Sequence, residues 1–136
     1  MIFDNEKLAW MLGQLMDQPE VYDALLVSGD GLVRACTPGL DRDTAEQMAA
    51  ALAGVQATSS ASARLCRSEP DSWEQSLTQF RDGYVITIRA GDGSFLTTAT
   101  SGSADVEAIS FRMHQLVAQL GGQMTSEPRH DTGSPT

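Results

Sequence analysis

Two segments, one near each end of the chain, carry apolar side chains at helical spacing with polar residues between them. Such a pattern predicts an amphipathic helix, because residues three and four apart share one helix face. We expect these helices at residues 7–18 and 106–120, the first ended by Pro19 and with Trp10 off its apolar face. The two apolar stripes are Leu8, Met11, Leu12, Leu15 and Met16, and Val106, Ile109, Met113, Leu116, Val117 and Leu120.

Short β-forming runs joined by tight turns predict two hairpins. Gly29-Asp30-Gly31 separates the first pair of runs, and Gly91-Asp92-Gly93 separates the second. An Asp-Gly pair suits a hairpin turn because glycine readily adopts positive φ. The four predicted strands span residues 23–28, 32–37, 84–90 and 94–100.

A fifth strand is predicted over residues 72–80, where the sequence is more polar. Alternation of side chains along a strand would place Trp73 and Leu77 on one face, with Glu74, Ser76 and Thr78 on the other. A strand with so few apolar residues is typical of the edge of a sheet.

The segment from residue 41 to residue 66 is built mostly from Ala, Ser, Gly and Thr. Its large apolar residues are few, namely Met48, Leu52, Val55 and Leu65. We expect one long helix, about 39 Å in length at a rise of about 1.5 Å per residue. Its start has two candidate caps, which are Asp41 and a capping box formed by Asp43 and Glu46.

The predicted order of elements is α-β-β-α-β-β-β-α. Helices packed on a five-stranded antiparallel sheet make an α+β fold. We expect one domain over residues 1–121. After Gly121 and Gly122 the composition turns to Ser, Pro, Gly, His and Asp, which predicts a flexible C-terminal tail over residues 122–136.

Small side chains cover nearly every side of the predicted central helix, so this helix can approach another backbone closely. An internal helix of this kind would bury its surface against its own domain. A symmetric dimer would instead pack the helix against its own copy, and the polar edge strand would add to its copy as well. The composition favours the dimer, because the outward side of the helix lacks the charges of a fully exposed helix.

The 136-residue chain has a formal net charge of -9. Such a surface repels phosphate backbones, so we do not expect nucleic-acid binding. No apolar run approaches the roughly 20 residues that span a bilayer. The N-terminal sequence has no basic region before an apolar segment, and we therefore expect a cytoplasmic protein without membrane insertion. Cys36 and Cys66 are too few for a disulfide framework and lack zinc-site spacing.

The sequence contains no P-loop, GxSxG or HExxH motif. His114 and His130 have no nucleophile or orienting acid placed beside them. Asp30 and Asp92 are candidate cation ligands, but a calcium loop needs several more spaced oxygens, so hairpin turns are the simpler interpretation. The arginines form no arginine-finger motif. We therefore expect no catalytic residues, no cofactor, no metal site and no enzymatic activity.

Four short runs follow one another along the chain. They are Leu26-Val27-Ser28-Gly29-Asp30-Gly31-Leu32-Val33, Gly39-Leu40-Asp41-Arg42-Asp43-Thr44-Ala45-Glu46-Gln47-Met48-Ala49-Ala50, Asp82-Gly83-Tyr84-Val85 and Gly91-Asp92-Gly93-Ser94. Their order and spacing resemble the Roadblock/LC7 family, the group related to dynein light chain LC7. The resemblance covers about residues 7–121 and is closest to Roadblock proteins of actinobacterial conservon operons.

The resemblance implies a profilin-like plan and a non-catalytic homodimer. In the family, the central helix and the strand after it form the dimer contact and make one sheet across two subunits. Family members bind or regulate small GTPases or act as scaffolds. The implied partners are therefore a second copy, a Ras-like small GTPase and a sensor-kinase-like protein in bacterial signalling.

Carried over to this sequence, the dimer contact uses the helix over 41–66 and the strand over 72–80. The predicted interface residues are Met48, Leu52, Ala53, Val55, Gln56, Ser59, Ser60, Ala63, Trp73, Gln75 and Leu77. The alternative function is that of a small-molecule sensor domain with a similar helix-on-sheet plan. That alternative predicts a roomy apolar pocket between the sheet and the helices.

Overall fold

The computed structural model describes residues 5–132, with side chains for residues 6–121. These residues form three α-helices, two short 3-10 helices (η) and five strands, in the order that the sequence predicts. The α+β fold class is therefore confirmed. The elements are α1 (Asn5–Met16), β1 (Val21–Val27), β2 (Val33–Cys36), α2 (Arg42–Ala61), η1 (Ala63–Cys66), η2 (Pro70–Ser72), β3 (Gln75–Phe80), β4 (Gly83–Arg89), β5 (Phe95–Ser101) and α3 (Val106–Thr132).

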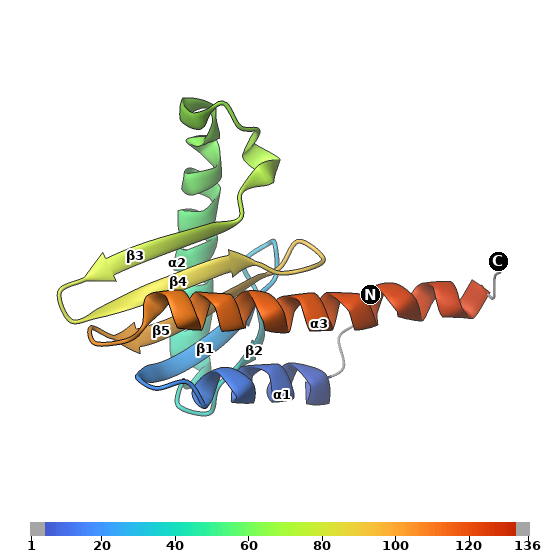
Figure 1. The fold of residues 1–136 in the computed structure, drawn as a ribbon, viewed down its shortest axis with the longest axis horizontal. Coiled ribbons are helices and arrows are strands. Elements are labelled where there is room, and N and C mark those ends of the chain that lie inside the picture. Colours follow the sequence, from blue (N-terminus) through green and yellow to red (C-terminus); the bar gives the residue numbers. More distant parts are fainter. Residues whose placement is uncertain (1–4, 133–136) are drawn as a thin grey trace.

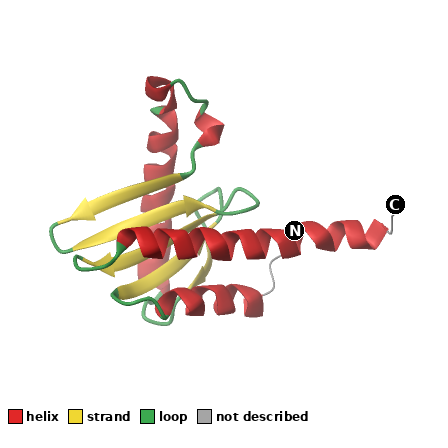
Figure 2. Cartoon of the chain, in the orientation of Figure 1, coloured by secondary structure: helices red, strands yellow, loops and turns green. Residues whose placement is uncertain are grey.

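The five strands form one antiparallel sheet in the order β2-β1-β5-β4-β3, so β2 and β3 are its two edges. Helices α1 and α3 lie side by side on one face, and α2 crosses the other face (Figure 1). Figure 2 shows that α2 runs across the strands and that its last turns extend beyond β3. One face of the sheet therefore carries two helices, and the other carries a single helix.

The main hydrophobic core lies between the sheet and the pair of helices α1 and α3. Leu12 and Leu15 of α1 and Met113 and Leu116 of α3 are fully buried against strand residues such as Ile88. This packing confirms both apolar stripes as core-facing, except that Met16 at the end of α1 is 38% exposed. Burying a leucine or methionine side chain contributes roughly 1.5–3 kcal/mol, so this layer supplies most of the apolar burial.

A smaller core lies under α2. Only Ala45 and Ala49 are fully buried among the residues of this helix, against Leu25, Val27 and Phe95 of the sheet. Alanine at the contact lets the helix lie close to the strands. Beyond the sheet core, α2 contacts η1, η2 and Trp73, and its Ser59 meets Ser76 of β3.

The central helix is shorter than predicted. It ends at Ala61 and is followed by η1, so the single helix expected over residues 41–66 is wrong in its last turn. Both the backbone N–H and the hydroxyl of Ser62 donate to the Ser59 carbonyl, at 3.1 and 2.7 Å. Serine competes for backbone hydrogen bonds in this way, which is why it favours helix ends over helix interiors.

The cap of α2 is Asp41, whose carboxylate accepts a 2.8 Å hydrogen bond from the Thr44 N–H. The competing capping box of Asp43 and Glu46 does not form the cap, because Asp43 already lies in the first helical turn. Glu46 instead accepts a 2.8 Å bond from Arg42. Of the two caps that the sequence left open, the structure therefore selects Asp41.

The other predicted boundaries also differ from the observed ones: α1 ends at Met16 and not at residue 18, the ends of β1, β2, β4 and β5 differ by one or two residues, and the largest differences are in β3 and α3. Strand β3 begins at Gln75, because η2 and Trp73 precede it, and α3 continues past Leu120 to Thr132. A glycine costs a helix only about 1 kcal/mol, so Gly121 and Gly122 do not end α3. Residues 133–136 of the predicted tail lie outside the described residues, and the flexibility of the tail and the domain limit at residue 121 stay predictions.

A candidate assembly surface on α2 and β3

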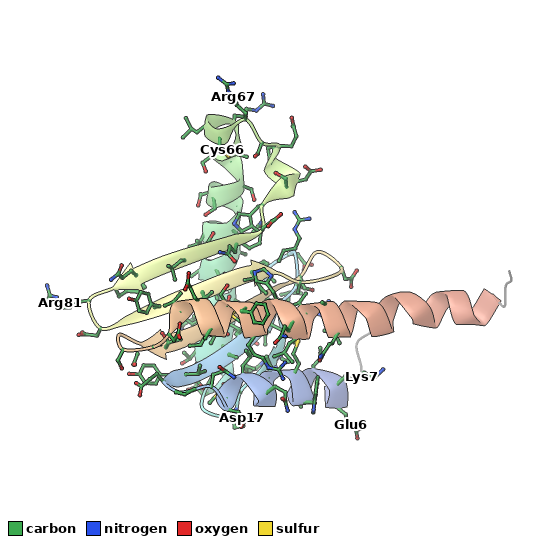
Figure 3. The ribbon with its side chains drawn as sticks, viewed as in Figure 1. Glu6, Lys7, Asp17, Cys66, Arg67 and Arg81 are labelled. Atoms are coloured by element: carbon green, nitrogen blue, oxygen red, sulfur yellow. The ribbon has the colours of Figure 1, made fainter. Side chains whose placement is uncertain are left out.

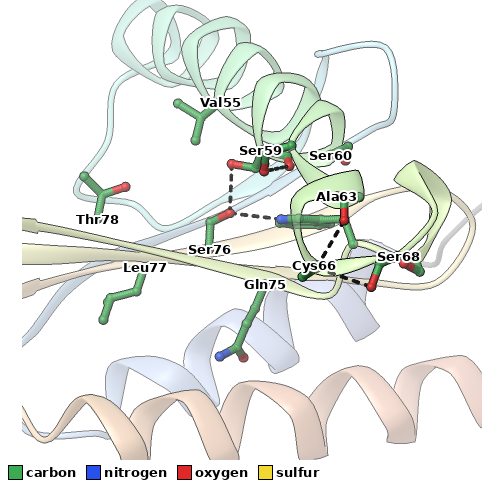
Figure 4. A pocket seen from close by; sticks show the side chains of 13 residues that line it. Val55, Ser59, Ser60, Ala63, Cys66, Ser68, Gln75, Ser76, Leu77 and Thr78 are labelled. Carbon is green, nitrogen blue, oxygen red and sulfur yellow. Dashed lines mark hydrogen bonds between the residues drawn. The ribbon is translucent and has the colours of Figure 1, made fainter.

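The free end of α2 is held over β3 by a chain of hydroxyl contacts. Trp73 Nε1 donates to Ser76 Oγ at 2.9 Å, and Ser76 Oγ donates to Ser59 Oγ at 3.3 Å (Figure 4). Ser59 belongs to α2 and Ser76 to β3, so this contact fixes the point at which the helix crosses the edge strand. Everything in α2 and η1 after Ser59 therefore lies near or beyond the last strand of the sheet.

We call residues 62–67 the overhang. It contains η1, and Figure 3 shows Cys66 and Arg67 at its far end, well away from the sheet. Leu65 in the overhang is 92% exposed, the largest exposed fraction among the exposed large apolar side chains of the described chain. The overhang projects past the sheet, so its exposed leucine covers no part of the sheet of its own chain.

An open cavity of about 450 Å³ lies between the overhang, the end of α2 and β3. Its walls are mostly small side chains, including Val55, Ser62, Ala63 and Thr78. Figure 4 shows Val55 and Ser59 of α2 on the same side of β3 as Ser76 and Thr78. The cavity is therefore the space between the crossing helix and the edge strand. It stays open because the side chains that line it are mostly small.

Strand β3 is an edge without the usual protection. Its six residues, Gln-Ser-Leu-Thr-Gln-Phe, carry no charge, and its pairing with β4 has no bulge. The opposite edge, β2, has only four residues, an irregular register with β1, and contacts with both α1 and α2. Short length, bulges and covering helices are how proteins block edge-to-edge pairing. The fold therefore protects one edge and leaves the other open.

The face assignment predicted for the edge strand is wrong for Trp73. Its indole reaches Ser76 and joins the small core under α2, whereas Leu77 and Gln75 point toward the α3 side of the sheet (Figure 4). The reason is that Trp73 precedes β3, at the end of η2, and does not follow the alternation of the strand. Gln75 is held on the α3 side by His114 Nε2 at 2.9 Å and by Ser110 Oγ at 3.3 Å.

The predicted interface residues fall into two groups. Met48, Val55, Gln75 and Leu77 are exposed, with 43% exposure for Met48 and 51% for Leu77. The others are partly covered by the same chain, and they are Leu52, Ala53, Gln56, Ser59, Ser60, Ala63 and Trp73. Ala53 lies beside the first hairpin, 3.4 Å from a Cβ placed on Gly31. The structure thus places all eleven residues on α2, on β3 or in the segment between them, and their role in an interface stays a prediction.

Two exposed apolar residues of this surface are absent from the predicted set. They are Leu65 of the overhang and Phe80 at the end of β3, which is 60% exposed. Alternation places Phe80 on the α2 side with Ser76 and Thr78. The sequence carried a signal for Phe80, since an aromatic residue ends an otherwise polar edge strand. Leu65 had no such signal, because it looked like part of a continuous helix.

The Gly-Asp-Gly segments are hairpin turns, as predicted. Gly31, Asp92 and Gly93 have positive φ values of 87°, 67° and 73°. A hydrogen bond from the Ser28 side chain lowers the pKa of Asp30, and Asp92 pairs with Arg34 at 3.4 Å. Both carboxylates therefore make contacts that stabilise the hairpins. Within the described residues there is no cluster of three or more His, Cys, Asp or Glu side chains that could hold a metal ion.

A second open cavity of about 480 Å³ lies at the end of the sheet, lined by residues such as Gln56, Trp73, Arg89 and Asp92. The Arg89 guanidinium donates to the Asp71 carbonyl at its rim.

None of the helices in the described part of the chain has the length and apolar character that a membrane span requires.

Comparison with known proteins identifies relatives of the whole fold. The family model for the Roadblock/LC7 domain matches residues 8–100. A Roadblock/LC7 domain from Streptomyces avermitilis is 32% identical, with a TM-score of 0.66, and the match covers 82% of this chain and 96% of that one. No curated protein gives a significant match.

Two solved structures share the fold at lower sequence identity. MglB of Myxococcus xanthus is 13% identical with a TM-score of 0.80, and the match covers 91% of this chain and 99% of that one. A structure described as MglB with tetrameric arrangement is 16% identical with a TM-score of 0.74, covering 88% and 91%. The family match, the Streptomyces relative and the order of strands and helices agree. The chain belongs to the Roadblock/LC7 family.

Proposed function

We propose that this protein is a non-catalytic, cytoplasmic homodimer that regulates or scaffolds a Ras-like small GTPase in bacterial signalling. A conservon-type setting, with a sensor-kinase-like protein as a further partner, belongs to the same proposal. The observation that carries it is the open, uncharged β3 edge beside the overhang of α2, in a chain of the Roadblock/LC7 family. The GTPase follows from what membership of this family implies.

Charge supports self-association at β3. Each copy carries a net charge of -9, so two copies repel one another over most of their surfaces. The residues of β3 contribute none of that charge. Two edges can therefore meet there without placing like charges opposite each other. One of the structurally similar proteins is described as MglB with tetrameric arrangement, and that description supports the proposed self-association.

The first test is the oligomeric state of the purified chain. Sedimentation at micromolar concentration is expected to give a dimer. A chain that stays monomeric at the highest soluble concentration contradicts the homodimer. The second test is capture of the Ras-like GTPase encoded beside the gene, loaded either with GDP or with a non-hydrolysable GTP analogue.

A regulator and a scaffold differ in what they do to the GTPase. A regulator changes the rate of GTP hydrolysis or of nucleotide exchange, measured with the dimer in excess over the GTPase. A scaffold binds the GTPase and leaves both rates unchanged. Capture of neither nucleotide state contradicts the GTPase proposal and leaves the homodimer to be judged by sedimentation alone.

The sensor-domain alternative has less support from the structure. It predicts a roomy apolar pocket between the sheet and the helices, but the described side chains fill that space with the two cores. The two cavities described above are open at the surface and have walls of mixed polar and apolar side chains. A thermal shift with one compound of a metabolite panel would favour the sensor, and the regulator predicts no such shift.

A further inference from the structure

We propose that the second open cavity, at the end of the sheet, binds the C-terminal carboxylate of a partner polypeptide whose last side chain is apolar. The cavity measures about 480 Å³ and is lined by η2, the β4–β5 hairpin and Gln56 of α2. Figure 1 shows this hairpin and the segment before β3 at the same end of the sheet. The proposed site requires neither the GTPase nor the homodimer proposed above.

Arg89 carries a positive charge that no carboxylate of the described chain neutralises. Its guanidinium donates to the Asp71 carbonyl, and it forms no ion pair within the described residues. Arg34, another arginine at this end of the sheet, is already held by Ser94 and Asp92. The remaining N–H groups of Arg89 are therefore available to a ligand, and a guanidinium matches the planar fork of a carboxylate.

The β4–β5 hairpin adds backbone donors to the same cavity. The Ala90 N–H donates to the Ser94 carbonyl at 2.8 Å, and the Ser94 N–H donates to the Gly91 carbonyl at 3.3 Å. Residues 91–93 all line the cavity, and their N–H groups have no hydrogen-bond partner within the described chain. Neighbouring unpaired N–H groups of a turn form a concavity that favours anions.

The charges around the cavity favour a carboxylate over a phosphate. Asp71 and Asp92 also line it, and Asp92 is paired with Arg34. The Asp71 carboxylate forms no ion pair within the described residues, so one guanidinium and one carboxylate remain unpaired. A ligand with a single negative charge can bind beside Arg89. A phosphate group, with a charge of about −1.5 to −2, is repelled more strongly by Asp71.

Aromatic side chains form the apolar part of the cavity. Phe95 is buried in the small core, and Trp73 packs against that core and is half-buried. The Trp73 indole N–H donates to Ser76 at 2.9 Å, which holds the ring in place. In a C-terminal residue the carboxylate and the side chain leave the same Cα atom. One residue can therefore bring its carboxylate to Arg89 and its side chain to Trp73.

The open mouth of the cavity favours a chain end over a small free acid. Pockets for small molecules bury about 70–90% of the ligand surface, which an open cavity does not do. A chain end needs such an opening, because the preceding residues must leave through it. Capture of a C-terminal carboxylate by backbone N–H groups is a recurring mode of peptide recognition.

Nuclear magnetic resonance of the indole N–H groups tests the binding. The chain has two tryptophans, and Trp10→Phe leaves the Trp73 signal alone. N-acetyl-phenylalanine is expected to shift this signal in a saturable way. Its uncharged amide and the doubly charged phenyl phosphate are each expected to bind at least about ten-fold more weakly. The absence of a saturable shift, or equal binding of the acid and either analogue, overturns the carboxylate site.

Substitution of Arg89 tests its role. Arg89→Gln is expected to weaken binding of N-acetyl-phenylalanine at least about ten-fold. Arg89→Lys keeps a charged donor for the Asp71 carbonyl but loses the planar fork, so an intermediate affinity is expected. Arg81→Gln is the matched control, because it removes the same charge from the turn at the other end of β4 (Figure 3). Equal affinities of the Arg89→Gln and Arg81→Gln proteins contradict the role of Arg89.

A peptide distinguishes a chain end from a free acid. An acetylated tripeptide that ends in phenylalanine is expected to bind at least as tightly as N-acetyl-phenylalanine. Weaker binding of the tripeptide means that the cavity holds a small carboxylic acid, which overturns the partner chain end. Sedimentation of the Arg89→Gln protein is expected to match that of wild type, so the outcome for this site is separate from the outcome for the homodimer.

Discussion

Arg34 on β2 donates a hydrogen bond from Nη1 to Ser94 Oγ over 2.7 Å, and this contact ties the two Gly-Asp-Gly hairpins together. The same nitrogen lies 3.4 Å from Asp92 Oδ2. Gly29 of the first hairpin also lies close to the second, because a Cβ at Gly29 would be only 3.0 Å from the Gly93 carbonyl oxygen. The two turns therefore form one packed end of the sheet.

The contact between Arg34 and Ser94 predicts a stability effect. Ser94 is 2% exposed, so Ser94→Ala is expected to lower the free energy of unfolding by about 1–2 kcal/mol. Asp92→Asn is the control, since asparagine tolerates the left-handed backbone at this position, and the Asp92 side chain is 44% exposed. Its expected loss is below about 1 kcal/mol. Urea unfolding measures both, and equal losses would contradict the role of Ser94.

Thr98 predicts a stabilising substitution. Its Oγ1 is buried and has no hydrogen-bond partner among the described residues. Thr98→Val replaces this hydroxyl by a methyl group of similar size and is expected to stabilise the fold by about 1 kcal/mol. Thr37→Val is the matched control, because Thr37 Oγ1 donates to Asp23 at 2.7 Å and accepts from the Ala24 N–H. The midpoint temperature of thermal unfolding is expected to rise for Thr98→Val and to fall for Thr37→Val.

Asp41 predicts a dependence of stability on pH. Hydrogen bonds from the side chain and backbone of Thr44 lower the pKa of Asp41 below its ordinary value of 3.8. The unfolded chain therefore takes up this proton first as the pH falls. The stabilisation is fully present above about pH 4 and is lost as the pH falls through the lowered value.

The matching variant is Asp41→Asn. Asparagine also caps helices, so this variant is expected to keep near wild-type stability at neutral pH. It is also expected to lose less stability than wild type between neutral pH and about pH 3. Urea midpoints at the two pH values measure this difference. An identical loss in both proteins would mean that other carboxylates carry the pH dependence.

The backbone N–H groups of β3 point alternately toward β4 and toward the free edge. Proline is therefore expected to have different effects at neighbouring positions of this strand. Gln79 points its N–H away from β4, so Gln79→Pro removes no hydrogen bond of the monomer and is expected to block only the proposed pairing. Thr78→Pro removes a bond to β4 and is expected to destabilise the monomer itself. Sedimentation and circular dichroism separate the two. A folded, dimeric Gln79→Pro protein would argue against dimerisation through β3.

Most of the fold could be predicted from periodicity and turn chemistry. The apolar stripes of α1 and α3 and the Asp-Gly turns are local patterns, and the structure keeps them. Local patterns fail where several competing bonds are available. Ser62 ends α2 by donating a hydrogen bond to the Ser59 carbonyl. In a stretch with several serines, the sequence does not indicate which serine ends the helix. Trp73 escapes the alternation of β3 because Pro70 starts a 3-10 turn just before it.

The candidate surface was predictable as a region and less so as a set of residues. Small residues on α2 and a polar edge strand point to a contact, but exposure depends on where the helix crosses the sheet. Ala53 packs beside the first hairpin, while Leu65 stands free of its own chain. That difference follows from strand order, since β3 pairs only with β4 and is the last strand of the sheet.

The central place of β5 predicts an order of folding events. Leu26 of β1 stands beside Leu96, which lies 70 positions later in the chain (96 minus 26). Contacts between residues so far apart close slowly, because much chain entropy is lost before they form. The β3–β4 hairpin joins β1 only through β5, so the open edge acquires its final position late. Refolding is therefore expected to show a slow, concentration-independent phase, followed by a second phase whose rate rises with protein concentration.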